Sequence, residues 1–294
     1  MSTGAVSVPL SAETASGRPR AWRAVVGSVE GRIGLALLVA MLLLIVFGPL
    51  LAPHDPAKIG VGAPQASPSA GLPLGTDELG RDVFSRYLNG GRGIVLIPLA
   101  ATVLAFLVGG VLGLAGAYRG GRTDAFVARV LDLGIALPAL LLTLVLIAGL
   151  GTSPVTLTLV IALVTAPRAG RVIRGAAQTV VGNDYVTAAQ LRGESAWYVM
   201  TREILPNAAG PILTIFSLYL TYAIIAISTL SFLGLGAQPP SSDWGLMVAE
   251  GRAYLTVNPW ATLVPALSIG VLAVAFTLIS DAIGQHIAGD GAEG

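Results

Sequence analysis

Long apolar runs limit what this chain can fold into more than any other feature does. Six segments are apolar enough to form membrane helices, at approximately residues 33–52, 94–118, 126–150, 155–169, 212–235 and 261–284. A helix needs roughly 20 such residues to cross about 30 Å of hydrocarbon. A soluble core can bury one such run but not most of a chain, and only 11% of the residues are charged. The sequence predicts an all-α membrane protein with six transmembrane helices.

The chain is divided further at its two ends. Residues 1–30 lack apolar periodicity and are predicted to be a disordered tail. The first apolar run is too long for a signal peptide, and Pro49 and Pro53 crowd the cleavage region, so we predict a retained helix. Residues 31–93 should hold this helix and an extracytoplasmic loop with a surface helix, residues 94–285 a five-helix core, and residues 286–294 a C-terminal tail.

Arginine is shared unequally between the two sets of segments that flank the spans. One set holds Arg18, Arg20, Arg23, Arg32, Arg119, Arg122, Arg129, Arg168, Arg171, Arg174, Arg192 and Arg202. The other set holds Lys58, Arg81, Arg86, Arg92 and Arg252. Positive charge is enriched on the cytoplasmic side of membrane proteins. We therefore predict a multi-pass protein of the cell membrane with both termini and residues 187–193 in the cytoplasm.

Small residues and prolines predict how the helices pack. Gly109 and Gly113 form a G-x-x-x-G pair that lets one face of the second span touch another backbone. Pro98, Pro138 and Pro265 lie inside spans and are expected to kink them.

A polar segment between the fourth and fifth spans predicts two short helices. Asn183 or Asp184 can cap the first helix by accepting backbone N–H groups. Gly193 can end it in the left-handed conformation. Ser195 can cap the second helix, which we expect Pro206 to end.

This segment reads D-Y-V-T-A-A-Q-L-R-G at residues 184–193 and E-I-L-P-N at residues 203–207. It resembles the cytoplasmic EAA loop of ABC-transporter permeases, which forms a coupling helix that docks on an ATPase subunit. The resemblance assigns ATPase coupling to Asp184, Thr187, Ala188, Ala189 and Gly193, with the two alanines as a low-relief docking face. Thr187 stands where the family usually has glutamate, and Glu203 where histidine is common. Asp184 lies one turn before Thr187 on the same face and can supply the negative charge of the glutamate that is usual in the family.

Two segments on the other side resemble signatures of peptide-importer permeases. Residues 74–86 read L-G-T-D-E-L-G-R-D-V-F-S-R, and residues 230–240 read L-S-F-L-G-L-G-A-Q-P-P, followed by D-W-G at 243–245. With the loop, they resemble the C-type subunit of dipeptide/oligopeptide ABC importers, whose subfamily also includes nickel and glutathione systems. The signature residues carried over are Gly75, Asp77, Gly80, Arg81, Asp82, Arg86 and Trp244.

The residues of these segments also predict local structure, independently of the resemblance. Thr76 or Asp77 can cap a short surface helix that ends at Arg86, in which Asp82 and Arg86 can pair four residues apart. Residues 239–240, two prolines, favour an extended loop, and Trp244 suits a membrane interface. Such a region can be a structural lid or a docking site for a substrate-binding protein, and the sequence leaves both open.

Acidic residues within the spans are few. Asp132 and Asp281 each lie near the predicted cytoplasmic interface, with no second acid or histidine at matching depth. We therefore favour structural pairing over proton relay for both. Residues 280–284 read S-D-A-I-G and depart from the G-D-x-L-R-D usual in the family.

Other functional classes fit the sequence less well. No phosphate-binding G-x-x-x-x-G-K-[ST] occurs, cysteine is absent, and the two histidines, His54 and His286, lie far apart, so neither an ATP-binding enzyme nor a metal site is predicted. A net charge of +1 gives no sign of a nucleic-acid partner. A secondary transporter needs coupling groups near the midplane, and it would leave the helical loop unexplained.

We therefore predict a non-enzymatic permease subunit of an ATP-driven importer for dipeptides or oligopeptides. A nickel or glutathione importer, or a secondary transporter, remains the alternative. The resemblance implies a homologous permease, two ATP-binding subunits that carry ATP and Mg, an extracytoplasmic substrate-binding protein, and no cofactor in this chain. The sequence does not identify residues of the substrate path.

Overall fold

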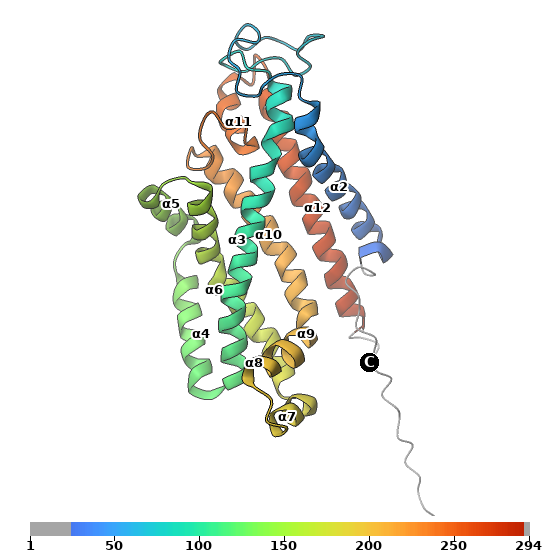
Figure 1. Ribbon diagram of the computed structural model, residues 1–294, viewed down its shortest axis with the longest axis vertical. Helices are drawn as coiled ribbons and strands as arrows, with labels where there is room; N and C mark the ends of the chain where they lie inside the picture. The colour runs from blue at the N-terminus through green and yellow to red at the C-terminus, as the bar shows by residue number, and fades with distance from the viewer. Residues whose placement is uncertain (1–24, 291–294) are drawn as a thin grey trace, which may run out of the picture.

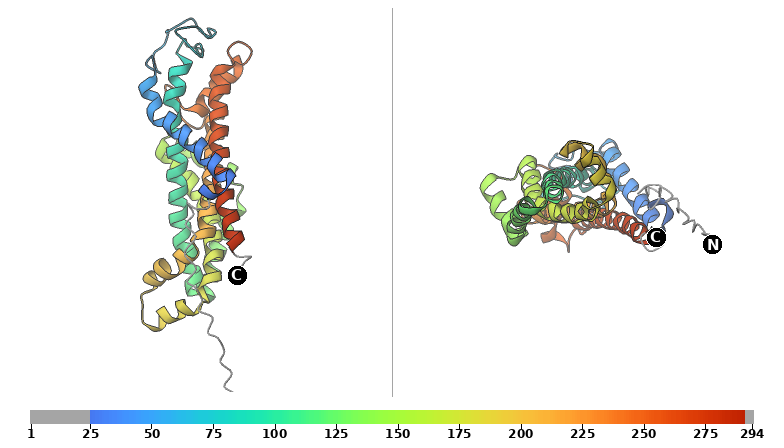
Figure 2. Two further views of the ribbon diagram at one scale, coloured as in Figure 1. Left: turned by 90° about the vertical axis from the view of Figure 1, so that its right-hand side faces the viewer. Right: turned by 90° about the horizontal axis from the view of Figure 1, so that it is seen from below.

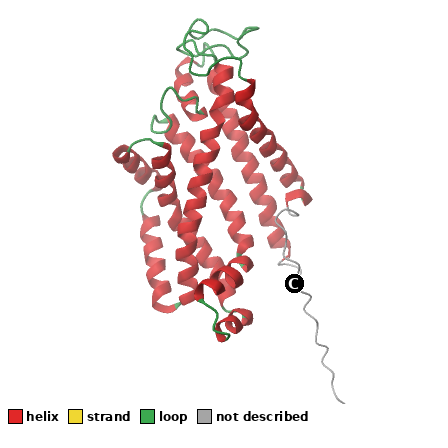
Figure 3. Cartoon of the chain, in the orientation of Figure 1, coloured by secondary structure: helices red, strands yellow, loops and turns green. Residues whose placement is uncertain are grey.

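The structure is a computed structural model that describes residues 25–290, with side chains as far as residue 285. Within this part of the chain, five helices are long and apolar enough to cross a membrane, and they run along one axis (Figure 1). They are α2 (Val29–Phe47), which continues as the 3-10 helix η1 (Gly48–Leu51), α3 (Val83–Arg119), α6 (Pro154–Val181), α10 (Ala209–Phe232) and α12 (Trp260–Asp290). Helices dominate the described residues (Figure 3), and the predicted all-α membrane fold is confirmed.

The predicted third span is broken into α4 (Gly121–Ala136) and α5 (Ala139–Leu150), which meet at an angle of 78°. The break lies at Leu137 and Pro138, both with extended backbone. A proline disfavours helical backbone in the residue before it and removes a hydrogen-bond donor. The described residues therefore contain six spans only if this bent pair is counted as one.

The other prolines do not interrupt their helices. Pro98 and Pro265 lie inside α3 and α12, and Pro167, which the sequence analysis did not single out, lies inside α6. Neighbouring helices pack against a membrane helix and compensate the lost hydrogen bond. A kink was expected at all three predicted positions, but at Pro138 the span breaks into two helices, whereas at Pro98 and Pro265 the helices continue.

The closest helix contact joins α3 to α6. A Cβ atom on Gly109 would collide with the backbone of Ala166 and Gly170, and one on Gly113 with the carbonyl oxygen of Gly170. The backbone approach predicted from the G-x-x-x-G pair is confirmed. Its partner, Gly170, was not foreseen. On the other side of the bundle, Gly34 lets α2 approach the backbone of α12 at Ala275.

Several predicted bounds differ from the observed ones. Helix α6 reaches Val181 rather than ending near residue 169, and α3 begins at Val83, so the expected division between residues 93 and 94 falls inside a helix. Helix α12 continues to Asp290, past the expected start of the C-terminal tail. Of the expected N-terminal tail, residues 1–24 lie outside the described residues, and residues 25–27 are helical.

Two non-spanning regions lie at opposite ends of the bundle (Figure 2). One end carries the turns of residues 52–82 and α11 (Trp244–Gly251), which is followed by the 3-10 helix η3 (Arg252–Tyr254); we call residues 52–82 and α11 the cap. The other end carries α7 (Asp184–Leu191), α8 (Ala196–Tyr198), the π-helix η2 (Val199–Ile204) and α9 (Leu205–Asn207), which we call the hairpin. Helix α2 begins and α12 ends toward the hairpin end (Figure 1).

Candidate functional sites: the hairpin, the cap and a pocket between them

The two ends of α7, the first helix of the hairpin, differ in how they are capped. Asn183 occupies the N-cap position of α7 with extended backbone, but its side-chain amide contacts the Tyr185 hydroxyl rather than capping the helix. At the other end Gly193 has a φ of +79° and donates to the Gln190 carbonyl (2.9 Å), while Glu194 N–H donates to the Ala189 carbonyl (3.3 Å). These are the paired hydrogen bonds of a Schellman motif. The prediction that Gly193 ends the helix is confirmed.

The second half of the hairpin begins as predicted and ends differently. The Ser195 Oγ accepts the N–H of Tyr198 (3.2 Å) and caps α8. The chain then passes through the π-helix and on through Pro206, and it leaves helical conformation only after Asn207. The expectation that Pro206 ends the helix was wrong. Pro206 lies two residues after the last residue of the π-helix, and the helical run ends one residue later, at Asn207.

The buried face of α7 holds the hairpin together. Val186 and Ala189 are fully buried, and they belong to the same apolar cluster as Val199, Ile204 and Ala177 of α6. Ala189 was expected on the docking face, and this expectation was wrong. Val186 and Ala189 are three residues apart, so they share one face of the helix, and that face points inward.

The exposed face of α7 carries the remaining predicted residues. Asp184, Thr187 and Ala188 are exposed. Beside them, the side chain of Leu191 is 84% exposed and that of Trp197 is 65% exposed. The sequence analysis did not identify these last two. An apolar residue two positions before the helix-ending glycine could have been recognised, because packing of this eight-residue helix uses only one face.

Two arginines and two acids form a largely buried ion-pair network that joins the cap to the first turn of α3. The Asp77 Oδ2 accepts from Arg81 Nε (2.6 Å) and from Arg86 Nη1 (2.5 Å). Glu250 of α11 accepts from the same two arginines, at 3.2 and 2.8 Å. Equal numbers of opposite charges leave the network neutral, which is the condition for burying ions.

The structure corrects the local expectations for residues 76–86. Asp77 accepts the N–H groups of Leu79 and Arg81 in a tight turn, so no surface helix precedes α3. Asp82 caps α3 by accepting the N–H of Phe84 (3.0 Å), and it does not pair with Arg86. Its other oxygen contacts Ser85 Oγ (2.6 Å) and His54 Nδ1 (3.0 Å).

Gly75 and Gly80 let the cap fold back on itself. Both have positive φ, +73° and +71°, which glycine adopts without strain. A Cβ on Gly75 would collide with the carbonyl of Ala66, and a Cβ on Gly80 with that of Gly62. Asn258 holds the turn further, because its amide donates to the Leu74 and Thr76 carbonyls at 3.0 Å each.

Trp244 is a core residue and not an interfacial one. Its side chain is 1% exposed, stacks on Tyr87 with 5.4 Å between ring centroids, and donates from Nε1 to the Tyr87 carbonyl (2.8 Å). Asp243 caps α11 by accepting the N–H groups of Gly245 and Leu246. Burial raises the pKa of the Asp243 carboxyl, although these hydrogen bonds act in the opposite direction. The Pro239–Pro240 peptide bond is cis and lies in a turn, rather than in the expected extended segment.

Carboxylates of α4 pair with arginines of α6. Asp124 binds Arg174 through two hydrogen bonds, at 2.5 and 2.6 Å. Asp132 pairs with Arg171, so the expected structural pairing is found, with a partner on another helix. Asp281, the other acid singled out, is exposed on α12.

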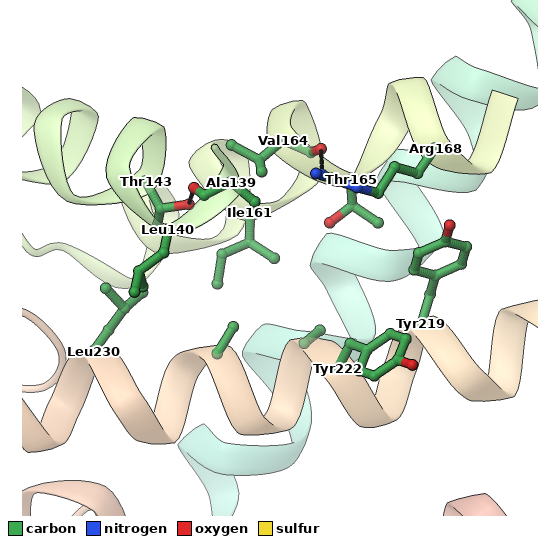
Figure 4. Close-up of a pocket in the computed structure, with 12 residues that line it drawn as sticks. Ala139, Leu140, Thr143, Ile161, Val164, Thr165, Arg168, Tyr219, Tyr222 and Leu230 are labelled. Atoms are coloured by element: carbon green, nitrogen blue, oxygen red, sulfur yellow. Dashed lines mark hydrogen bonds between the residues drawn. The ribbon is translucent and has the colours of Figure 1, made fainter. Parts of the chain in front are cut away.

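A pocket of about 420 Å³ opens between α5, α6 and α10 (Figure 4). Its walls are mostly aliphatic, and its polar groups come from Thr143, Thr165, Arg168, Tyr219 and Tyr222. The sequence analysis identified no substrate path. The three-residue spacing of Tyr219 and Tyr222 places both on one face of α10, but which helix they face depends on the fold.

Comparison with known proteins agrees with these features. Residues 101–289 match the family model of the binding-protein-dependent transport system inner membrane component, and residues 20–68 match the N-terminal TM domain of oligopeptide transport permease C. The chain is 41% identical over 247 residues to the probable D,D-dipeptide transport system permease protein DdpC of Escherichia coli (strain K12), covering 84% of this chain and 83% of the relative. It is 35% identical over 257 residues to the dipeptide transport system permease protein DppC of Haemophilus influenzae, covering 85% of this chain and 87% of the relative.

A solved structure shares the fold. A chain of the MetNI methionine ABC transporter, in a crystal form described as inward facing, superposes with a TM-score of 0.53 at 12% identity. The match covers 67% of this chain and 96% of the other. The family matches, the close relatives and the all-helical fold lead to one conclusion: this chain belongs to the family of binding-protein-dependent transport system inner membrane components.

Proposed function

We propose that this chain is a permease subunit of an ATP-driven importer of dipeptides or other short peptides. The observation that carries the proposal is the 41% identity, over most of both chains, to a probable dipeptide permease. Relatives whose names specify peptides, dipeptides or di- and tripeptides match over similar lengths. A homologous permease completes the path, two ATPase subunits supply the energy, and an extracytoplasmic binding protein delivers the peptide. Nickel and glutathione are the competing substrates.

The hairpin is the proposed contact for an ATPase subunit. The exposed face of α7 combines polar and small residues with the apolar side chain of Leu191, and Trp197 of α8 is exposed at the same end of the bundle. Exposed apolar side chains of this kind favour a protein partner. Asp184, Thr187 and Ala188 lie on this face, whereas Ala189 and Gly193 act by holding its shape.

The packing beneath α7 suggests how motion is transmitted. The buried residues Val186 and Ala189 join α7 to η2, and the same cluster continues to Leu114 of α3 and Ile173 of α6. Densely packed side chains transmit displacement because they compress little. When ATP binding brings the ATPase subunits together, α7, η2 and the ends of α3 and α6 move as one body. That movement switches the path between outward and inward access.

We assign the cap to the extracytoplasmic side and the hairpin to the cytoplasm, following the arginine distribution without Arg168, which lies near the midpoint of α6. Because the chain has no cysteine, Ser69→Cys in the cap and Gln190→Cys on α7 are clean reporters, and both positions are exposed. In intact cells that express the permease pair without its ATPases, a membrane-impermeant thiol reagent should label the first and spare the second. Labelling of Gln190→Cys from outside would reverse the orientation.

Transport itself is tested by reconstitution. The permease pair, the ATPases and the binding protein are placed in liposomes, and uptake of a labelled dipeptide, Ni²⁺ and glutathione is measured side by side. Dipeptide uptake should require ATP hydrolysis and survive collapse of the proton gradient. Uptake of Ni²⁺ or glutathione without dipeptide uptake would reassign the substrate. Uptake by this chain alone, driven by an ion gradient, would make it a secondary transporter.

A further inference from the structure

Three arginines follow one another along α6, and they are not equivalent. Arg171 pairs with Asp132, and Arg174 pairs with Asp124, both acids on α4. Arg168 stands one turn nearer the cap. Among the ion pairs of the described residues it has no carboxylate, and its Nη1 donates only to the Val164 carbonyl (3.0 Å) of its own helix. One cation of this series is therefore left without a counter-ion.

No acid of α4 or α5 lies beside Arg168, because residues 133–150 contain neither aspartate nor glutamate. Helix α4 supplies carboxylates to α6 as far as Asp132, then ends at Ala136, and α5 turns away by 78°. Where α4 would have continued along α6, the pocket opens, and Arg168 is one of its lining residues. Arg168 thus combines a guanidinium that has no carboxylate partner among the described residues with a place in the wall of the pocket.

Three of the polar residues of the pocket lie at its Arg168 end, and Thr143 lies at the other end (Figure 4). Thr165 lies on the same helix, and Tyr219 and Tyr222 lie opposite on α10. Tyr219 is held by an edge contact with Phe106 of α3, at 5.9 Å between ring centroids. The remaining wall is aliphatic apart from Thr143, whose hydroxyl donates to the Ala139 carbonyl (2.7 Å). A carboxylate that accepts from arginine and from hydroxyl groups, joined to an apolar group, matches both parts of the lining.

The depth of Arg168 limits where an anion could come from. It lies near the midpoint of α6 (Pro154–Val181), about 20 Å from either end of that helix. Lipid headgroups lie at the membrane surfaces, and a charged residue at mid-depth faces a polar path or cavity. The volume of about 420 Å³ is within the range of about 300–1,000 Å³ seen for small-ligand pockets.

We propose that this pocket is a carboxylate subsite of the transport path, in which Arg168 binds the carboxylate of a short peptide while the peptide crosses the membrane. The proposal rests on the proposed function and extends it by naming the substrate group and the residue that meets it. Arg171 and Arg174 are excluded from this role because each is already neutralised by an acid of α4.

The charge preference of the pocket can be measured without any transport. Thr165→Cys places one thiol beside Arg168 in an otherwise cysteine-free chain. In the assembled complex, the thiol is reacted with methanethiosulfonates of opposite charge, sulfonatoethyl and trimethylammonioethyl. Adding Arg168→Gln should lower the ratio of the anionic to the cationic rate by about tenfold or more. Arg129→Gln, which removes an exposed arginine of α4, is the matched control and should leave the ratio unchanged. An unchanged ratio with Arg168→Gln would refute the subsite. This result is also the one expected if an acid of the homologous permease neutralises Arg168.

Protection experiments identify the ligand group. A dipeptide without acidic side chains should slow labelling of Thr165→Cys, and its C-terminal amide should not. Equal protection by the amide would overturn the assignment to the carboxylate. In liposomes, Arg168→Gln should reduce dipeptide uptake about tenfold or more while ATP hydrolysis stimulated by the peptide-loaded binding protein persists, and Arg168→Lys should recover part of it. A complex that imports no peptide but keeps the charge ratio refutes the proposed function and not the anion subsite.

Discussion

The cap and the hairpin each carry a short sequence motif of ABC-importer permeases, but the motif residues are buried in the cap and partly exposed in the hairpin. In the cap the motif residues are buried: Arg86 is 1% exposed and binds Asp77 and Glu250. In the hairpin, buried alanine and valine hold the shape, and Thr187 and Ala188 face outward without an ion-pair network. A buried motif stabilises its own region, whereas an exposed one is available to a partner. The difference favours a structural role for the cap signature and a binding role for the outer face of α7.

The strongest test of this comparison is Arg86→Met in the cap. The change leaves Asp77 and Glu250 buried with one arginine instead of two, and unpaired buried charge costs about 3–5 kcal/mol. We expect a much lower melting temperature in detergent and a lower abundance of the protein in the membrane. Arg92→Met, at an exposed position of the same helix, is the control. A variant as stable as the wild type would show that the network does not hold the cap.

The two neighbouring alanines of α7 separate folding from binding. Ala189→Asp buries a carboxylate without a partner and should cost at least about 3 kcal/mol of hairpin stability. Ala188→Asp changes an exposed site, so melting should stay within about 0.5 kcal/mol of the wild type, while binding of the ATPase subunits weakens. Melting and co-purification of the ATPases measure the two effects. If both variants lost stability equally, the assignment of the two faces of α7 would be wrong.

A smaller effect is expected at the end of α7. Gly193→Ala forces a side chain into left-handed backbone at a cost of about 1–2 kcal/mol. Gly182→Ala is the matched control because Gly182 has a φ of −79° with open space around it. Hydrogen exchange of the α7 amides should accelerate in the first variant only. Equal exchange in both would mean that the Schellman motif does not stabilise the hairpin.

The smallest effect concerns pH and the cap. Burial raises the pKa of Asp243 above its usual 3.8, so the folded cap favours the neutral carboxyl. The stability from this residue is present below pH 3.8 and is lost as the pH rises through the folded pKa. Asn in its place accepts the same N–H groups without ionising. As pH rises from 4 to 7, the melting temperature of Asp243→Asn should therefore increase relative to that of the wild type. A pH-independent difference would contradict this.

Prediction from sequence succeeded at some positions where the cause is local, although the predictions for Asn183, Asp77 and Pro206 failed. Gly193 and Ser195 cap their helices as expected because both act on backbone groups within a few residues. Prediction also failed where the partner is remote. Arg86 was paired with Asp82, four residues away, yet it binds Glu250 of α11, and Arg81 reaches the same acid across 169 residues of sequence. Ala189 was misplaced because alanine is compatible with either face of so short a helix.

The sequence by itself determined that this chain spans a membrane through several helices, which short helices are capped by Gly193 and Ser195, and which motifs the chain shares with peptide permeases. Hydropathy and backbone capping depend on residues that are close along the chain, so the sequence contains this information directly. Only the tertiary structure decided that Arg168 has no counter-ion, that Trp244 is buried, and that a pocket opens beside α5. These features depend on which helices lie next to one another, and the pocket depends in particular on the 78° turn between α4 and α5.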